Sequence, residues 1–222
     1  MAKSEEPETE CWPPLLANER QVSGLFAVAL SSVCPVSSPE HPIVRTVRGD
    51  EDDDVGSNGR VDFLASYGHR EIALELKRCP ISSLGDAGDK KGLKNQWLTV
   101  SKQSKQALLH MREVRGSYRR PISIGLLVVR ISRKIGARQD IEAGRMSAAV
   151  ALPEMARELK KAHKPDFLSY YVPPIEMQTT SDCVDGKTTY RVFPGVVFMA
   201  VVHGNTSPGL SPFVPFPACF GR

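Results

Sequence analysis

The chain has 222 residues, of which 41% are hydrophobic and 24% are charged, and its formal net charge is +4 at pH 7. The length suggests one domain, or one domain with an elaboration, and the composition is that of a soluble globular protein with ample residues for a buried core. No apolar run is long enough to span a membrane, so we expect no membrane partner.

The cysteines and the N-terminus bear on the cellular compartment. The cysteines are Cys11, Cys34, Cys79, Cys183 and Cys219. They are scattered and form no Cys-x-x-Cys motif, which argues against a zinc site and for reduced thiols. The first ten residues, MAKSEEPETE, are acidic and lack the pattern of a secretory signal. We therefore expect a cytoplasmic protein, or a nuclear one if the source is eukaryotic.

The N-terminal part predicts a flexible tail followed by a helix. Residues 1–14 are acidic and end in Trp12-Pro13-Pro14, which is typical of an unpacked tail. Apolar residues recur at helical spacing over residues 16–33, and Pro35 ends the helix. Glu19 lies in the first turn, where the helix dipole stabilises a carboxylate.

A strand and an acidic loop are expected next. Residues 41–48, HPIVRTVR, predict the first strand. Residues 49–59 contain an acidic run from Asp50 to Asp54 but lack the ligand spacing of a calcium loop. We therefore expect residues 49–59 to form an exposed loop.

Residues 59–78, GRVDFLASYGHREIALELKR, predict a β-hairpin. Its strands are residues 61–67 and 70–76, and Gly68-His69 is typical of a two-residue type II′ turn. That turn pairs Tyr67 with Arg70, which places Asp62 directly opposite Glu75 on one face. Lys77 lies two residues beyond Glu75 and therefore points to the same face.

Two carboxylates and an ammonium group thus converge on one small patch. Like charges directly opposite each other destabilise a β-ladder, and a divalent cation between Asp62 and Glu75 would remove the repulsion. Carboxylate oxygens suit hard ions such as Mg2+. The hairpin therefore predicts a metal site, with the apolar residues of its second strand anchored to the core on the other face. The alternative is a solvated hairpin in which Glu75 and Lys77 form an ordinary surface pair.

The following segment predicts a loop, a helix and a buried strand. Residues 79–94 contain Pro, Gly and Ser and predict a loop, and residues 94–115 carry the apolar stripe of a helix. Lys102, Lys105 and Arg112 fall on another side of this helix, near Gln103 and Gln106. Residues 121–131, PISIGLLVVRI, are the kind of strand that is buried on both faces.

Charge is unevenly distributed along the chain. In residues 84–138 Lys and Arg far outnumber the acids, which are Asp86, Asp89 and Glu113. A basic segment beside an acidic metal site suits a polyanionic substrate, and the alternative is a solvated basic face.

The C-terminal part predicts a helix, a second hairpin and a tail. Residues 151–163 are periodic, and Asp185-Gly186 is typical of a type I′ turn. Strands are expected at residues 179–184, 187–193 and 195–203. Residues 205–222 are Pro-rich and irregular. This part could cover the core, form a dimer contact or bind substrate.

Asp62, Glu75 and Lys77 together resemble the motif of the PD-(D/E)XK nuclease superfamily. Asp62 matches the first acidic residue, Glu75 and Lys77 match the E-x-K, and Val61 stands where the family name has proline. The predicted order of helix, three strands, helix and strand over residues 15–131 is that superfamily's core order. The resemblance implies an α/β fold, with a restriction-endonuclease-like mixed sheet over residues 15–135 and a C-terminal α+β elaboration over residues 136–204.

The resemblance also implies a metal-dependent phosphodiesterase, and we favour a DNA endonuclease. Asp62, Glu75 and the carbonyl of Leu76 would bind Mg2+, for which Mn2+ can substitute. Lys77 would position the attacking water and stabilise the transition state. By resemblance, Glu19, Gln103 and Gln106 would also lie near the site. The basic segment supplies the residues expected to bind nucleic acid, which are Lys94, Lys102, Lys105 and Arg112. A homodimer is compatible because two sites cut two strands.

Two alternatives stay open. A nuclease-like module could bind nucleic acid or a partner without cleavage, although an intact Asp62, Glu75 and Lys77 set argues against it. RNA could also replace DNA as the substrate. A Ser, Cys or His nucleophile is disfavoured, because Cys34 and Cys79 lack an evident partner and no G-x-S-x-G motif occurs.

Overall fold

A computed structural model describes residues 19–48, 54–82, 87–115, 120–135, 141–173, 179–184 and 187–204. The helices are α1 (Glu19–Val33), α2 (Ala87–Arg115) and α3 (Ile141–His163). The strands are β1 (Val36–Arg48), β2 (Asp54–Tyr67), β3 (Arg70–Ile81), β4 (Arg120–Ile135), β5 (Phe167–Tyr171), β6 (Thr179–Val184) and β7 (Lys187–Gly204). The expected tails, residues 1–14 and 205–222, lie outside the described residues.

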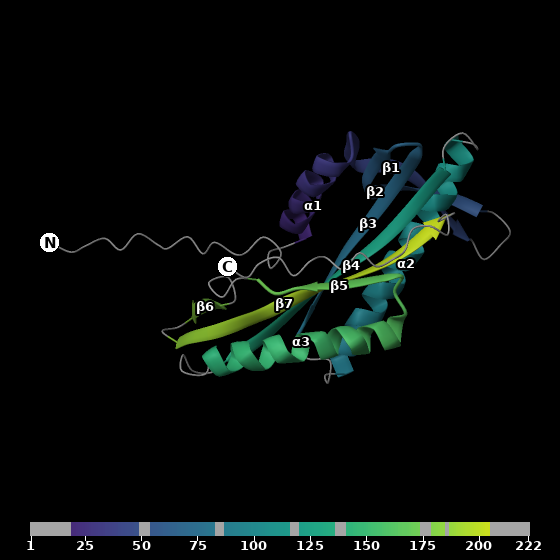
Figure 1. Ribbon diagram of the computed structural model, residues 1–222. Coiled ribbons are helices and arrows are strands. Elements are labelled where there is room, and N and C mark those ends of the chain that lie inside the picture. Colours follow the sequence, from purple (N-terminus) through teal and green to yellow (C-terminus); the bar gives the residue numbers. More distant parts are fainter. Residues whose placement is uncertain are drawn as a thin grey trace.

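The strands form one mixed sheet (Figure 1) with the order β1-β2-β3-β4-β7-β5, and β6 pairs with β7. Neighbouring strands are antiparallel except β3 and β4, which run parallel and are joined through α2. A parallel pair needs such a crossover because a tight turn reverses the direction of the chain and can join only antiparallel strands. The predicted α/β class with helices flanking a mixed sheet is confirmed.

The helices divide between the two faces of the sheet. On one face α2 and α3 pack together, because Trp97 and Val100 of α2 and Leu159 of α3 share a buried cluster with Val129 of β4. On the other face α1 is the one helix among the described residues, and its Val22 belongs to a cluster that contains Leu76. Alternation along β3 therefore assigns its odd-numbered residues to the α2 face and its even-numbered residues to the α1 face.

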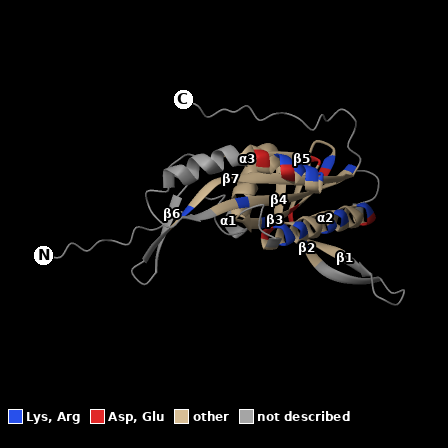
Figure 2. Ribbon diagram, turned by 90° about the horizontal axis from the view of Figure 1, so that it is seen from below, with Lys and Arg blue, Asp and Glu red and all other residues tan. Residues whose placement is uncertain are grey.

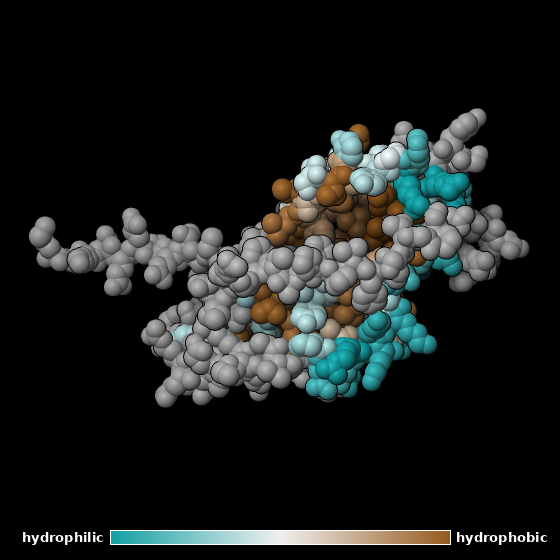
Figure 3. Space-filling view, viewed as in Figure 1, coloured by the Kyte–Doolittle hydropathy of each residue, from teal (hydrophilic) through white to brown (hydrophobic). Residues whose placement is uncertain are grey.

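Helix α1 covers its face of the sheet only in part. It has 15 residues, against 29 in α2. Phe26, Leu126 and Phe198 on this face are therefore only half-buried, and Figure 3 shows apolar surface in the upper part of the molecule, where Figure 1 draws α1 and the ends of the strands.

Two loops predicted from the sequence are shorter than expected. The prediction of a loop over residues 49–59 was wrong from residue 54 onward, where β2 begins. Gly56 and Gly59 of β2 pair with Thr46 and Ile43 of β1. The ladder thus overrides the low strand propensity of a Gly-rich segment.

The prediction of a loop over residues 79–94 was wrong at both of its boundaries. β3 continues to Ile81, which is buried and pairs with Ile131 of β4. α2 begins at Ala87, and Asp89 in its first turn accepts hydrogen bonds from the amide and hydroxyl of Ser82, at 2.6 and 2.7 Å. Gly88 and Gly92 do not interrupt the helix, because Leu93 anchors it in the core.

The C-terminal part contributes to the same sheet. The strand at residues 179–184 is confirmed, and its last residue, Val184, pairs with Lys187. The turn predicted at residues 185–186 lies outside the described residues. Two separate strands were expected over residues 187–203, but β7 is continuous to Gly204, with a register shift opposite Ile131 and Arg133. Strand β5 was not predicted, and α3 begins ten residues earlier than expected, at Ile141.

Candidate active site

The β2–β3 hairpin has the register that the turn predicts. Tyr67 pairs with Arg70, and the ladder continues without a shift to Phe63 and Leu74. Gly68 has a φ of 56°, whereas His69 is not among the positive-φ residues, which is the pattern of a type II′ turn. The next step of this register is Asp62 with Glu75.

At that step the backbone ladder gives way to a side-chain contact. The carboxylate Oδ2 of Asp62 accepts a hydrogen bond from the amide of Leu76, at 2.6 Å. The neighbouring ladder, between β1 and β2, also omits the pair of Glu40 with Asp62, and Glu40 has a φ of 49°. Asp62 therefore lies at a local distortion of β2, and its carboxylate reaches the peptide that follows Glu75.

Glu75 lies on the face of the sheet that α2 covers. It is level with Gly125 of β4. A Cβ on Gly125 would lie 2.8 Å from Oγ of Ser104 and 2.9 Å from the carbonyl oxygen of Val100, so α2 packs directly on this strand. Glu75 is only 1% exposed, although the sequence analysis expected this face of the hairpin to present its residues openly. Lys77 has the same parity as Glu75 and is half-buried.

The two glutamines of α2 lie beside the residue that packs over Gly125. Ser104 is fully buried, and its hydroxyl donates to the carbonyl of Ser101 at 3.1 Å. Gln103 is half-buried, and its Oε1 is enclosed without a hydrogen-bond partner among the described residues. Gln106 is also half-buried. An enclosed acceptor without a donor can receive a bond from a water or a ligand, so Gln103 is the stronger of the two candidates.

Glu19 is separated from the E-x-K residues by the sheet. It begins α1, and α1 packs on the face of Leu76, opposite to the face of Glu75 and Lys77. The Glu19 side chain lies outside the described residues.

The basic residues of α2 form an exposed row. Lys102, Lys105 and Arg112 are all exposed, and their spacing of three and seven residues keeps them on one side of the helix. Figure 2 shows Lys and Arg recurring along α2. Lys94 is exposed as well but lies nearer the N-terminal end of the helix, facing α3.

Three arginines on the α1 face were not singled out from the sequence. Arg130 of β4 is 8% exposed, and its guanidinium lies 5.6 Å from the centre of the Phe193 ring. Burial, together with Arg78 and Arg191, lowers the pKa of Arg130 to about 10. An arginine inside the apolar run of residues 121–131 was the sequence signal for this cluster, because a charge in a buried strand needs a specific partner.

Carboxylate oxygens are the ligands that a hard divalent cation prefers, and Asp62 and Glu75 carry them on adjacent strands, each one residue beyond the last paired positions of the hairpin. Among the described residues, no group of three or more His, Cys, Asp or Glu residues is placed to hold a metal. Any ion at this site would therefore complete its coordination with a backbone oxygen and water.

Comparison with known proteins adds no relative. No family of known proteins, no curated protein and no solved structure matches the chain. None of the described helices has the length and apolar character that crossing a membrane requires.

Proposed function

We propose that the protein is a metal-dependent phosphodiesterase of the PD-(D/E)XK type that cleaves nucleic acid, with DNA as the favoured substrate. The observation that carries the proposal is the contact of Asp62 with the amide of Leu76, between Glu75 and Lys77. It brings the Asp62 carboxylate to the backbone of the E-x-K segment. The element order from α1 to β4 and the mixed sheet support a restriction-endonuclease-like core.

Asp62, Glu75 and the Leu76 carbonyl are the residues that would hold Mg2+. A bound Mg2+ would lower the pKa of a water ligand and neutralise phosphate charge. The hydrogen bond from the Leu76 amide orients the Asp62 carboxylate at the E-x-K segment. Burial of Glu75 keeps water away from its carboxylate and strengthens its attraction for a cation.

Lys77 and Gln103 act on the reacting groups. The ammonium of Lys77 shares a face with Glu75, where it can donate to the attacking water or to the phosphate oxygens as charge develops. The enclosed Oε1 of Gln103 can accept a hydrogen bond from the same water. The exposed row of Lys102, Lys105 and Arg112 would contact phosphates of the substrate without regard to its sequence.

The test is cleavage of supercoiled plasmid, linear duplex, single-stranded DNA and RNA with Mg2+, with Mn2+ and with EDTA. We expect metal-dependent cleavage that EDTA abolishes. Lys77→Ala should lower the cleavage rate by on the order of 100-fold or more and leave nucleic-acid affinity nearly unchanged. Lys161→Ala, at an exposed position of α3, is the matched control and should cleave normally.

A binding module without cleavage is the second candidate. The observation that favours it is the burial of Glu75 beneath α2, since a substrate phosphate must come close to this carboxylate for catalysis. Nucleic-acid binding without cleavage of any substrate, and without a metal-induced rise in Tm, would support this module and overturn the nuclease. Cleavage of RNA alone would assign the RNA-cleaving alternative.

A further inference from the structure

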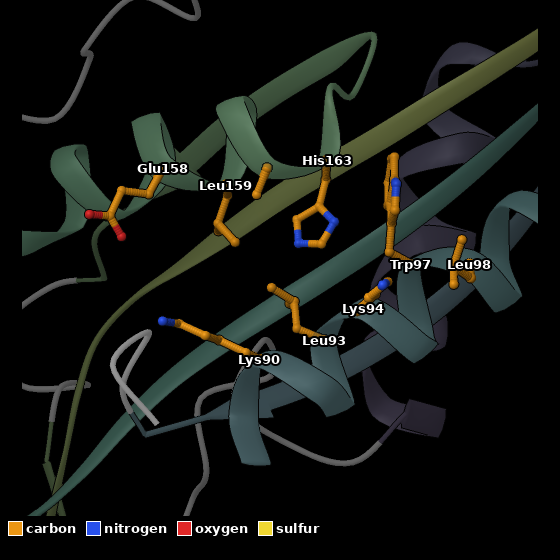
Figure 4. Close-up of a pocket in the computed structure, with 9 residues that line it drawn as sticks. Lys90, Leu93, Lys94, Trp97, Leu98, Glu158, Leu159 and His163 are labelled. Atoms are coloured by element: carbon orange, nitrogen blue, oxygen red, sulfur yellow. The ribbon is translucent and has the colours of Figure 1, made fainter. Parts of the chain in front are cut away.

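A groove of about 520 Å³ lies between α2 and α3 (Figure 4). Trp97 of α2 and His163 of α3 approach each other across it, with ring centres 6.2 Å apart and ring planes inclined by 58°. Figure 4 shows Leu93 and His163 near the middle of the groove and Trp97 towards one end. The groove thus has an aromatic wall contributed by both helices.

The floor and the rim of the groove differ in chemistry. Leu93 and Leu159 are buried and form an apolar floor beside the two rings. Lys90 and Lys94 are exposed and stand on the α2 side. A ligand with a flat apolar ring and a negatively charged group would complement both parts.

Charge around the groove is mainly positive. Lys90 and Lys94 are the Lys residues among the described lining residues. Glu158 is the acid among the described lining residues. Burial and, to a lesser extent, Lys94 lower the pKa of His163, so its ring is neutral near pH 7 and suited to stacking.

The size of the groove favours a small ligand or a single base over a protein helix. Pockets of about 300–1,000 Å³ hold small molecules, whereas a helix needs a longer hydrophobic channel. Base stacking on aromatic rings, combined with cationic contacts to the backbone, is the usual way in which proteins bind single-stranded nucleic acid.

The groove lies on the same face of the sheet as the candidate active site. Trp97 precedes Ser104, which packs over Gly125 beside Glu75, by seven residues of α2. At a rise of 1.5 Å per residue this is about 10 Å along the helix. A nucleic-acid strand at the active site could therefore reach the groove with a neighbouring nucleotide.

We propose that this groove binds one unpaired base of single-stranded nucleic acid, with the base against His163 and Trp97 and its phosphate at Lys90 and Lys94. The inference rests on the proposed function and narrows its substrate to nucleic acid with a single-stranded segment. A single strand, unlike a duplex, can turn a base out of the stack at little cost.

Binding is measured without cleavage, by fluorescence anisotropy of a labelled single-stranded DNA in EDTA. Ala162→Phe places a ring in the groove from an exposed position and should lower the affinity about tenfold, since it displaces one stacked base. The double variant Lys90→Gln/Lys94→Gln should weaken binding and reduce its salt dependence. Lys161→Gln, which does not line the groove, is the control and should lose less affinity than the double variant.

A second readout locates the base. The chain has two tryptophans, so Trp12→Phe leaves Trp97 as the only one. Single-stranded DNA should change the emission of Trp97, and an abasic strand of equal length should not. Unchanged affinity in both Ala162→Phe and Lys90→Gln/Lys94→Gln, or an equal response to the abasic strand, would overturn the groove proposal.

The two proposals fail separately. If the wild type cleaves with Mg2+ but filling the groove changes neither affinity nor emission, the groove proposal is wrong and the nuclease stands. If the groove variants lose affinity for single strands but the wild type cleaves nothing, the groove stands and the nuclease is wrong. Binding of duplex as tightly as single strands, with equal loss in the Ala162→Phe variant, would also overturn the preference for an unpaired base.

Discussion

Two glycines, one packed against α2 and one exposed within α2, allow close packing and helix propensity to be tested separately. Gly125→Ala should destabilise the protein by about 1–3 kcal/mol, because the new methyl group would press on the carbonyl of Val100, which cannot move without shifting α2. Gly92→Ala lies within α2 with nothing within 4 Å and should stabilise it by about 0.5–1 kcal/mol. Urea unfolding measures both. Equal effects of the two changes would mean that α2 does not pack tightly on β4.

Asp62 can be changed in ways that separate its structural bond from its charge. Asp62→Asn keeps an oxygen acceptor for the Leu76 amide but removes the negative charge, so the variant should melt no lower than wild type in EDTA and bind Mg2+ more weakly. Some cleavage should return with Mn2+, which binds such sites more tightly.

Asp62→Ala supplies the comparison. It removes the acceptor as well as the charge, so we expect a loss of stability of about 1–3 kcal/mol in addition to weaker metal binding. Metal binding is followed through the rise in Tm with Mg2+ concentration. An Asp62→Asn variant that melts lower than wild type in EDTA and cleaves normally with Mg2+ would make the carboxylate purely structural.

His163 should make folding stability depend on pH. Burial between Leu159 and Trp97, with Lys94 nearby, lowers the pKa of His163 from its usual value of 6.5. Between the folded pKa and pH 6.5 the unfolded chain therefore binds more protons than the folded protein. The free energy of unfolding is highest above pH 6.5 and decreases as the pH falls towards the folded pKa.

The measurement is urea unfolding of wild type and His163→Gln between pH 5 and pH 8. The free energy of unfolding of the wild type should fall more steeply below pH 6.5 than that of the variant. Lys90 and Glu158 line the same groove from the two helices and remain in both proteins. Parallel curves would show that His163 titrates normally.

At the scale of the element, the exposed row on α2 has a measurable signature. Replacing Lys102, Lys105 or Arg112 singly with Gln should weaken nucleic-acid binding equally for all sequences and lower the slope of log K against log salt by about one. Glu113→Gln, exposed on the same helix, is a control that removes no positive charge. An unchanged slope in all three variants would assign the row to ordinary solvated surface.

The elements that could be predicted are those whose signals are local. The turn at Gly68-His69 alone sets the register that brings Asp62 level with Glu75, because a two-residue loop leaves one pairing. The stop at Pro35 and the apolar run of β4 are equally local. Strand β5 was missed because most of its residues are exposed and its pairing with β7 is its main support.

The covering of the site could not be predicted, because it depends on contacts between distant residues. Glu75 is buried since α2 approaches Gly125 without a side chain between them, and these segments are far apart in sequence. The start of β2 at Asp54 similarly depends on β1. The groove at Trp97 and His163 lies between two helices, and their packing against each other depends on contacts between residues that are far apart in the sequence.

At the scale of the whole molecule, the order of strands in space differs from their order in the chain. β4 lies between β3 and β7, and β7 is the last described strand. A chain that ends at residue 140 would therefore leave the β7-facing edge of β4 unpaired, and such an apolar edge promotes aggregation. We expect residues 1–140 to aggregate when expressed alone, as judged by sedimentation of the lysate, while the full chain stays in the supernatant. A soluble, monomeric fragment would contradict this expectation.

The same order has a consequence during synthesis. Translation adds about 5–20 residues per second, so several seconds separate the appearance of β4 on the ribosome from that of β7. During this interval the hairpin with Asp62, Glu75 and Lys77 can already form, but β4 still awaits its neighbour. The part of the nascent chain that carries the candidate site is therefore complete before the sheet that shelters it, and chaperones would have to protect the edge of β4 until the last strand is made.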